Sequence, residues 1–297
     1  MIKVAEGIYL LDCLFAGLPG QCGVFLLRGR ESALIDCGPS LGVGHVIAGL
    51  ESAGIARGDI RYILLTHTHM DHAGGASLFL EHYPGAQVLV DEKTSWQLAD
   101  PARLVRSASR ALGDIAPYYG TMSPIPAERM IPLGDGQVLE IGGERSLRAL
   151  HTPGHSSGHF AFFEEGAGAL FCGDALGHLI MDSGHIFPAT PAPEFDLELS
   201  MASAERLAAL APRLLLFPHF GATGRAAEVF DRFAAQLKLS RSLAEGFRDE
   251  EEAPVLLAAA LLQEMPPLKE GEERLIPGIL KVNAGGVLHH LRKLEKG

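Results

Sequence analysis

Short apolar runs recur along residues 1–225, and most of them end at glycine, aspartate, proline or histidine. Runs of this length that are closed by turn-forming residues are typical of buried β-strands. They predict strands at 8–12, 24–29, 32–38, 62–67, 86–90, 137–141, 146–151, 159–164, 169–174 and 214–219. Apolar residues at helical spacing predict helices among these strands, at 43–53, 76–83, 103–112 and 195–210.

The pattern changes near Gly224. Beyond it, apolar residues recur only at helical spacing, as at Val229, Phe230, Phe233 and Leu237, and again at Val287, Leu288, Leu291 and Leu294. Pro254 fits the first position of a helix. We therefore divide the chain into a strand-rich domain, 1–225, and a mostly helical segment, 226–297. The apolar stripes of that segment can pack on the first domain or on a second copy, which leaves a homodimer open.

Two strand-rich halves, each followed by helices, predict an α/β fold in which two sheets pack face to face with helices outside. Residues 92–130 interrupt the alternation with one helix and a loop that holds two tyrosines and two prolines, Tyr118, Tyr119, Pro124 and Pro126. Loop-rich inserts of this kind often cover a binding site, so we expect this segment close to the functional residues.

Composition and charge narrow the class of protein. The chain has 297 residues, of which 47% are hydrophobic and 21% charged, as in ordinary globular proteins. Its formal net charge of -11 argues against nucleic acid as a partner and favours a small-molecule substrate. The four cysteines form no CxxC pair. The N-terminus lacks a signal-peptide centre and the most apolar stretch, 254–262, is too short for a bilayer, so we expect a cytoplasmic protein without membrane contact.

The strongest chemical signal is the segment His67-Thr68-His69-Met70-Asp71-His72, which directly follows an apolar strand. Neutral imidazoles and a carboxylate are ligands for zinc, iron and manganese. If the segment is an extended turn, His67 and His69 project to the same side. Asp71 and His72 then face a second point nearby, so that one short segment can contribute to two metal sites.

Three further candidate ligands also follow apolar strands. His155 lies in HTPGHSSGH, Asp174 in LFCGDAL and His219 in LLLFPHFG. Strand ends of a sandwich converge on one edge, where these side chains can meet the first segment. His151 and His159 flank His155 and are weaker candidates for the same position.

These motifs resemble those of the metallo-β-lactamase superfamily. THTHMDHAGG is similar to the HxHxDH signature of that family, and TPGHSSGH, FCGD and PHFG follow in the family's order. TPGHSSGH is most similar to glyoxalase II and related hydrolases. The resemblance covers about residues 1–225 and implies an αββα sandwich with its site at one edge. The helical C-terminal segment is also similar to that of glyoxalase II.

The resemblance also implies a set of metal ligands. One metal would be held by His67, His69 and His155, and the other by Asp71, His72 and His219. Asp174 would bridge the two. The implied cofactors are two divalent metal ions, with zinc expected and iron or manganese as alternatives. Asp71 and Asp174 are the residues expected to be catalytic, because Asp71 can also pass a proton to the leaving group.

This metal centre predicts a hydrolase. A water shared by two metals becomes a hydroxide nucleophile near neutral pH. We expect it to attack a small ester, thioester or lactone, with an acyl thioester as the most specific form of the hypothesis. The reaction needs no serine or cysteine nucleophile.

Three alternatives stay open at the level of sequence. The same ligands hold non-haem iron in relatives that carry out redox chemistry on oxygen or sulfur. A phosphodiesterase or nuclease is disfavoured by the net charge and by the absence of Lys/Arg runs. A non-enzyme with a structural metal is disfavoured because structural zinc sites are usually closed and four-coordinate.

One further carboxylate, Asp36, lies near the end of the predicted strand 32–38. Its side chain can orient a ligand imidazole from behind, or it can cap its own turn, and the sequence does not distinguish these roles.

Overall fold

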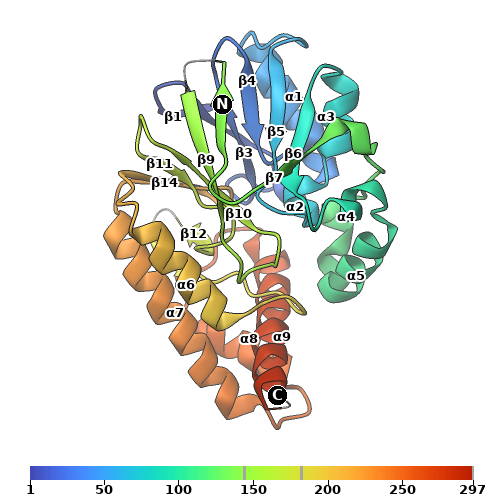
Figure 1. Cartoon of the computed structure of the whole chain (residues 1–297). Helices are drawn as coiled ribbons and strands as arrows, with labels where there is room; N and C mark the ends of the chain where they lie inside the picture. Colours follow the sequence, from blue (N-terminus) through green and yellow to red (C-terminus); the bar gives the residue numbers. More distant parts are fainter. Residues whose placement is uncertain (143–144, 181–182, 296–297) are drawn as a thin grey trace.

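A computed structural model describes residues 1–142, 145–180 and 183–295 of the chain. Two β-sheets lie face to face and helices cover their outer faces, which confirms the predicted αββα sandwich with helices at its C-terminal end (Figure 1). Among the described residues, no helix is both long enough and apolar enough to cross a membrane.

The first sheet has seven strands in sequence order. They are β1 (Ile2–Ala5), β2 (Ile8–Asp12), β3 (Gly23–Leu27), β4 (Ser32–Ile35), β5 (Ile60–Leu64), β6 (Gln87–Asp91) and β7 (Met130–Leu133). Neighbouring strands are antiparallel from β1 to β4 and parallel from β4 to β7. The parallel strands therefore all end at the same edge, the one that β5 leaves toward His67.

The second sheet has six strands in the order β15-β14-β11-β10-β9-β8. They are β8 (Val138–Ile141), β9 (Arg145–His151), β10 (Phe160–Glu164), β11 (Ala169–Phe171), β14 (Leu214–Phe217) and β15 (Gly221–Thr223). Of its neighbouring pairs, only β11 and β14 are parallel. A separate hairpin is formed by β12 (His178–Ile180) and β13 (His185–Phe187).

Three apolar clusters fill the sandwich: one lies between the two sheets, and one lies between each sheet and the helices that cover it. Alternation along β3 shows how they arise: Phe25 and Leu27 enter the cluster between the sheets, whereas Val24 and Leu26 enter the cluster beneath the helices. Because both faces of β3 are buried, the strand reads as an unbroken apolar run. A third cluster joins the second sheet to the C-terminal helices.

Helices on the first sheet are α1 (Val43–Ser52), α2 (Met70–Ala73) and α3 (Ala76–His82), and the insert adds α4 (Trp96–Ala99) and α5 (Ala102–Leu112). The second sheet is covered by α6 (Leu197–Ala208), α7 (Ala226–Phe247), α8 (Ala253–Gln263) and α9 (Ile276–Leu294). Short 3₁₀ turns lie at Phe15–Gly17, Ser40–Gly42, Gly113–Tyr119, Ala127–Arg129 and Glu272–Arg274. Figure 1 shows α7, α8 and α9 gathered at one end of the molecule.

The ligand segment differs from the expected extended turn. His69 is extended, but Met70–Ala73 forms one turn of helix in which the amides of His72 and Ala73 both donate to the carbonyl of His69. Gly74 makes this turn possible, since a Cβ there would lie 2.1 Å from the carbonyl oxygen of Met70. Asp71 and His72 therefore project from a helical turn rather than from extended chain.

Helix α9 packs directly on the loop that follows β13. The Asn283 side chain accepts a hydrogen bond from the amide of Thr190 at 3.0 Å and donates one to the carbonyl of Pro188 at 3.0 Å. A Cβ at Gly286 would lie 1.7 Å from the carbonyl oxygen of Thr190, whereas one at the adjacent Gly285 would meet nothing within 4 Å. Only glycine at position 286 allows this close approach.

This contrast predicts opposite effects of two neighbouring substitutions. Gly286→Ala should lower the melting temperature by roughly 5 °C, because overpacking costs about 2 kcal/mol. Gly285→Ala should raise it slightly, since alanine favours a helix by about 1 kcal/mol over glycine. Thermal unfolding followed by circular dichroism measures both. Equal effects of the two variants would show that α9 does not approach the loop this closely.

Candidate metal centre

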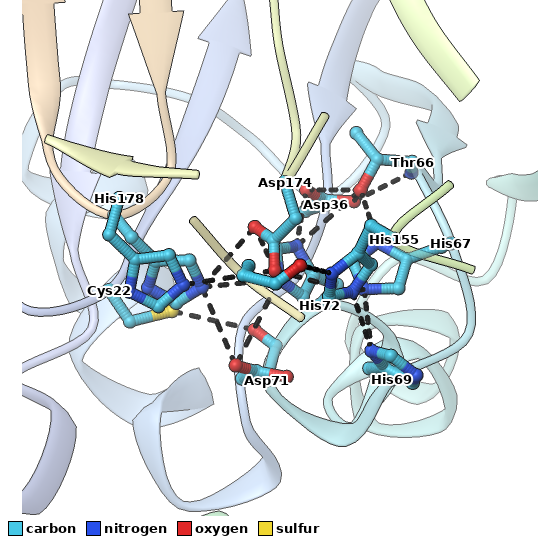
Figure 2. Close-up of polar contacts among 12 residues, drawn as sticks. Cys22, Asp36, Thr66, His67, His69, Asp71, His72, His155, Asp174 and His178 are labelled. Atoms are coloured by element: carbon cyan, nitrogen blue, oxygen red, sulfur yellow. Dashed lines mark hydrogen bonds and ion pairs between the residues drawn. The ribbon is translucent and has the colours of Figure 1, made fainter. Parts of the chain in front are cut away.

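All seven predicted ligands lie at one edge of the sandwich. His67 and His69 follow β5, Asp71 and His72 lie on α2, His155 follows β9, Asp174 follows β11 and His219 follows β14. Figure 2 shows these segments, far apart in the sequence, meeting around one point. The edge where the strands end thus gathers the candidate ligands, whereas their binding of metal stays a prediction.

We call His67, His69 and His155 the first cluster. Their facing nitrogens are 3.0 Å apart between His67 Nε2 and His69 Nδ1, 3.1 Å between His155 Nε2 and His67 Nε2, and 2.9 Å between His155 Nε2 and His69 Nδ1. Zinc–nitrogen bonds of about 2.0–2.1 Å at tetrahedral angles place ligand nitrogens roughly 3.3 Å apart. The first cluster is therefore close to the spacing that one zinc ion requires.

We call Asp71, His72 and His219 the second cluster. His219 Nε2 lies 3.2 Å from His72 Nε2 and 3.4 Å from Asp71 Oδ2, and His72 Nε2 lies 3.9 Å from Asp71 Oδ2. All three donor atoms lie within 4.8 Å of one another, as they also do in the first cluster. The second cluster is a mixed nitrogen and oxygen set of the kind that divalent metals accept.

Asp174 faces both clusters. Its Oδ2 lies 3.4 Å from His155 Nε2, and its Oδ1 lies 3.4 Å from His72 Nε2. Figure 2 shows Asp174 between the imidazoles of the first cluster and His178 on the other side. The side chain is only 4% exposed, and its buried Oδ1 has no hydrogen-bond partner among the described residues. An orphaned buried carboxylate oxygen is costly unless a cation or a proton satisfies it.

Asp36 orients one histidine from each cluster, which decides the question that the sequence left open. His72 Nδ1 donates to Asp36 Oδ2 at 2.9 Å. The Thr66 hydroxyl donates to the same carboxylate at 3.0 Å, so it accepts the hydrogen of His67 Nδ1, also at 3.0 Å. Asp36 is therefore a positioning residue behind the ligands and does more than cap its own turn.

Backbone carbonyls fix two other imidazoles. His155 Nδ1 donates to the carbonyl of Ala189 at 2.9 Å, and His219 Nδ1 donates to that of Gln21 at 2.7 Å. Because four outer nitrogens carry hydrogens, the Nε2 atoms of those rings point unprotonated lone pairs inward in the neutral form. Converging lone pairs together with an unpartnered carboxylate oxygen fit two bound cations, which the residues of both clusters would hold.

Burial and charge set different protonation tendencies in the two clusters. In the first, burial lowers the pKa of His67 and His69, and it lowers that of His155 to about 4. In the second, burial opposes the charged form of His72 and His219, but Asp174 and the neighbouring carboxylates outweigh it and raise both pKa values. Burial likewise opposes ionisation of Asp71 and Asp174, yet the facing imidazoles hold both pKa values below the usual range.

The flanking histidines have other roles. His159 accepts the backbone amide of Asp174 on Nε2 at 3.0 Å and contacts the Thr152 hydroxyl through Nδ1 at 2.8 Å, so it holds the loop that carries Asp174. His151 donates to the carbonyl of Ser157 at 2.8 Å. Neither reaches the first cluster as His155 does. From the sequence, His178 could line the pocket or face solvent. In the structure it borders the cavity, stacks on His219 with ring centroids 4.2 Å apart and lies 3.9 Å from Asp174 Oδ2.

A cavity of about 400 Å³ opens above the two clusters. Its floor includes Asp71, His155 and Asp174, one wall is the apolar face of α5, and the opposite wall includes Ile279 and Val282 of α9. Tyr119 also borders it, packed edge-on against Phe15, and burial raises the pKa of its phenol. The insert and the C-terminal segment thus both form the walls of the candidate site.

An αββα sandwich with paired His/Asp clusters at one edge defines a class of metal-binding proteins, and comparison with known sequences identifies the family. The sequence model of the Metallo-beta-lactamase superfamily matches residues 17–219. The chain therefore belongs to the metallo-β-lactamase superfamily.

Three relatives illustrate the range of similar proteins. The chain is 32% identical over 164 residues to the metallo-beta-lactamase fold-containing protein ST1585 of Sulfurisphaera tokodaii, covering 54% of this chain and 60% of ST1585. It is 34% identical over 155 residues to a hydroxyacylglutathione hydrolase of Aeromonas hydrophila (52% and 45%). It is 31% identical over 183 residues to an atrochrysone carboxyl ACP thioesterase of Aspergillus fumigatus (60% and 36%). The chain thus spans about half the length of the curated relatives it matches.

The fold is shared over a longer range. A crystal structure of ST1585 from Sulfolobus tokodaii superposes with a TM-score of 0.72 at 24% identity, covering 97% of this chain and 98% of that one. The helices beyond residue 219 therefore have counterparts in that structure.

The opposite pKa shifts of the two clusters predict stepwise metal release on acidification. Metals bind neutral imidazole, so protons compete weakly at the first cluster, where the histidine pKa values are lowered, and strongly at the second, where they are raised. As pH falls from 8 to 5.5, bound zinc should drop from two ions to one per chain. Zinc analysis after gel filtration at each pH measures this. Simultaneous loss of both ions would contradict the assignment.

The contacts of Asp36 predict a second effect. Asp36→Asn should weaken zinc binding by roughly 10- to 100-fold, because it loosens one histidine in each cluster. Competition with a chelating dye measures the affinity. The matched control is Asp91→Asn, which removes a buried carboxylate on β6 that has no contact with a ligand histidine among the described residues. Equal affinity of both variants would refute the positioning role of Asp36.

Proposed function

We propose that the chain is a hydrolase that requires two divalent metal ions, with zinc as the expected metal, and cleaves small acyl thioesters. The observation that carries the proposal is the position of Asp174, whose two oxygens face the two clusters. When bound, two such metals supply an acidified water as nucleophile and positive charge for the carbonyl oxygen. Two of the relatives described above are named as a hydrolase and a thioesterase, which supports the same class of reaction.

The chain's own residues hold the metals, transfer a proton and bind the substrate. The imidazoles and Asp174 hold the metals in place, with their outer nitrogens fixed by Asp36, Thr66 and two backbone carbonyls. Asp71 borders the cavity as a carboxylate. It can take a proton at the carboxylate that faces the cavity and release it to the departing group. The apolar walls hold the acyl part of the substrate and exclude water.

The charges around the cavity favour a thioester over an alkyl ester or lactone. The carboxyl groups that line the cavity are Asp71, Asp174 and Glu194, and all three have lowered pKa values because nearby imidazoles, and for Glu194 also Ser157, outweigh their burial. None is therefore a protonated acid at neutral pH. A leaving thiol, with a pKa near 8.5, departs as an anion far more readily than an alcohol. Such a site favours substrates that need little proton donation.

A substrate panel tests the proposal. Zinc-loaded protein should hydrolyse short acyl thioesters, and it should be much slower with the matching alkyl esters and with a phosphodiester. His155→Ala and Asp174→Asn should each lower kcat/KM by at least 100-fold, whereas His45→Ala, an exposed histidine on α1, should leave it unchanged. Metal analysis of the same preparation distinguishes zinc from iron or manganese. Turnover of the phosphodiester alone, or activity in His155→Ala, would refute the proposal.

A further inference from the structure

Helix α5 carries a row of positive charge beside the cavity. Its sequence, ARLVRSASRAL, contains three arginines and no acid, although the chain has a net charge of -11. Arg103, Arg106 and Arg110 are spaced three and four residues apart, so they share one face of the helix. At 1.5 Å per residue the row extends over roughly 10 Å. The face is exposed along its whole length.

These arginines have no acidic partner among the residues that the structure describes. Some other exposed arginines do: Arg206 pairs with Asp135 at 2.8 Å, and Arg248 pairs with Glu295 at 2.6 Å. No described carboxylate lies within 4 Å of a guanidinium of the α5 row. A concentration of unpaired cations on an acidic protein is suited to an anionic ligand.

The row lies at the rim of the cavity. Leu104, Ala108 and Leu112 form the apolar face of α5 that lines the cavity, and Arg103 lines it as well. On a helical wheel Arg110 lies about 20° from Arg103, and Arg106 lies about 60° from it, both on the side away from the apolar face. A bound ligand that extends out of the cavity past Arg103 therefore reaches the other two arginines.

Trp96 completes the rim. It is the only tryptophan of the chain, lies on α4 directly before α5, and borders the same cavity. Its side chain is 52% exposed, which is unusual for so large an apolar group. An exposed indole beside guanidinium groups is suited to a flat aromatic base that carries phosphates: the ring stacks on the base and arginine binds phosphate with two parallel hydrogen bonds.

We propose that the leaving thiol of the substrate carries a phosphorylated purine nucleotide, as in coenzyme A, and that Trp96 and the α5 arginines bind this nucleotide. The inference rests on the proposed thioesterase activity. The acyl group and the thioester lie in the apolar cavity above the metal clusters, and the phosphates lie outside it along α5. Hydrolysis adds one water across the thioester. The carbon–sulfur bond breaks, the acyl carbon gains the hydroxyl of water, and the sulfur leaves as a thiolate that takes up the remaining proton.

A thiol with carboxylates only, such as glutathione, would use the arginines but leave the indole without a partner. A phosphopantetheine arm on a carrier protein would place a phosphate at the rim without a purine. Both can be distinguished from the proposed ligand, because the Trp96 side chain should strengthen binding only of a ligand that carries the nucleotide.

Binding is measured first, independently of catalysis. Because Trp96 is the only tryptophan, its fluorescence reports directly on the rim. Coenzyme A and adenosine 3′,5′-bisphosphate should quench it, whereas pantetheine and glutathione should not. The double variant Arg106→Glu/Arg110→Glu should weaken coenzyme A binding at least tenfold. The control Arg30→Glu/Arg57→Glu makes the same change of charge at exposed positions in the turns before β4 and β5. These turns lie at the ends of the two strands away from the candidate ligands, so the control should leave binding unchanged.

Catalysis is then compared for butyryl thioesters of coenzyme A, pantetheine and glutathione. The kcat/KM for the coenzyme A thioester should exceed that for pantetheine by at least tenfold, mainly through KM. Trp96→Ala and the α5 double variant should each remove this advantage. The double variant, whose arginines do not line the cavity, should leave the rate with the pantetheine thioester within twofold. Equal rates for coenzyme A and pantetheine, a preference for glutathione, or a requirement for a carrier protein would each overturn the inference. Quenching by coenzyme A without hydrolysis of any thioester would instead refute the proposed function and leave the nucleotide site standing.

Discussion

The convergence of unprotonated imidazole nitrogens on a buried carboxylate is the interaction on which the site depends. Four outer nitrogens donate to Asp36, Thr66 and the carbonyls of Ala189 and Gln21, which fixes the tautomers and turns lone pairs inward. Lone pairs about 3 Å apart repel one another unless a cation lies between them. The fold therefore brings together a donor set that is unfavourable by itself and becomes favourable when positive charge is bound.

The partners behind the ligands connect the site to distant parts of the chain. The carbonyl that orients His155 belongs to the loop at 188–190, and Asn283 of α9 hydrogen-bonds on both sides of that carbonyl. The C-terminal helix, which lies beyond the segment matched by the family, thus reaches the first cluster through one intermediate loop. Helix α9 therefore both forms a wall of the cavity and supports the loop that orients His155.

The sequence was most informative where residue type and position carry the same signal. Histidines and aspartates that directly follow apolar runs predicted which side chains meet at the edge, because parallel strands end together. The sequence was less informative about the groups that hydrogen-bond to the outer nitrogens of these histidines. Ala189 and Gln21 contribute only a backbone carbonyl, which any residue offers, and Asp36 acts through contacts with Thr66 and His72, some 30 residues along the chain. The helical turn at Met70–Ala73 was missed because it depends on the close packing at Gly74. The position of His178 stayed open because its stacking on His219 is purely tertiary.

The candidate ligands and the cavity walls above them are held in place by different parts of the fold. The candidate ligands lie on short segments at the ends of buried strands, so that the sandwich fixes where they project. The cavity walls come from α5, which buries none of its residues fully, and from α9. Side chains of α5 can therefore change at the rim without altering the candidate ligands below, whereas α9 is buried along one face and also supports the loop that orients His155. In the proposed hydrolase, the strand ends set the reaction type and the two helices set the choice of substrate. The α5 arginines, which have no acidic partner among the described residues, therefore inform the substrate more than the candidate ligands do.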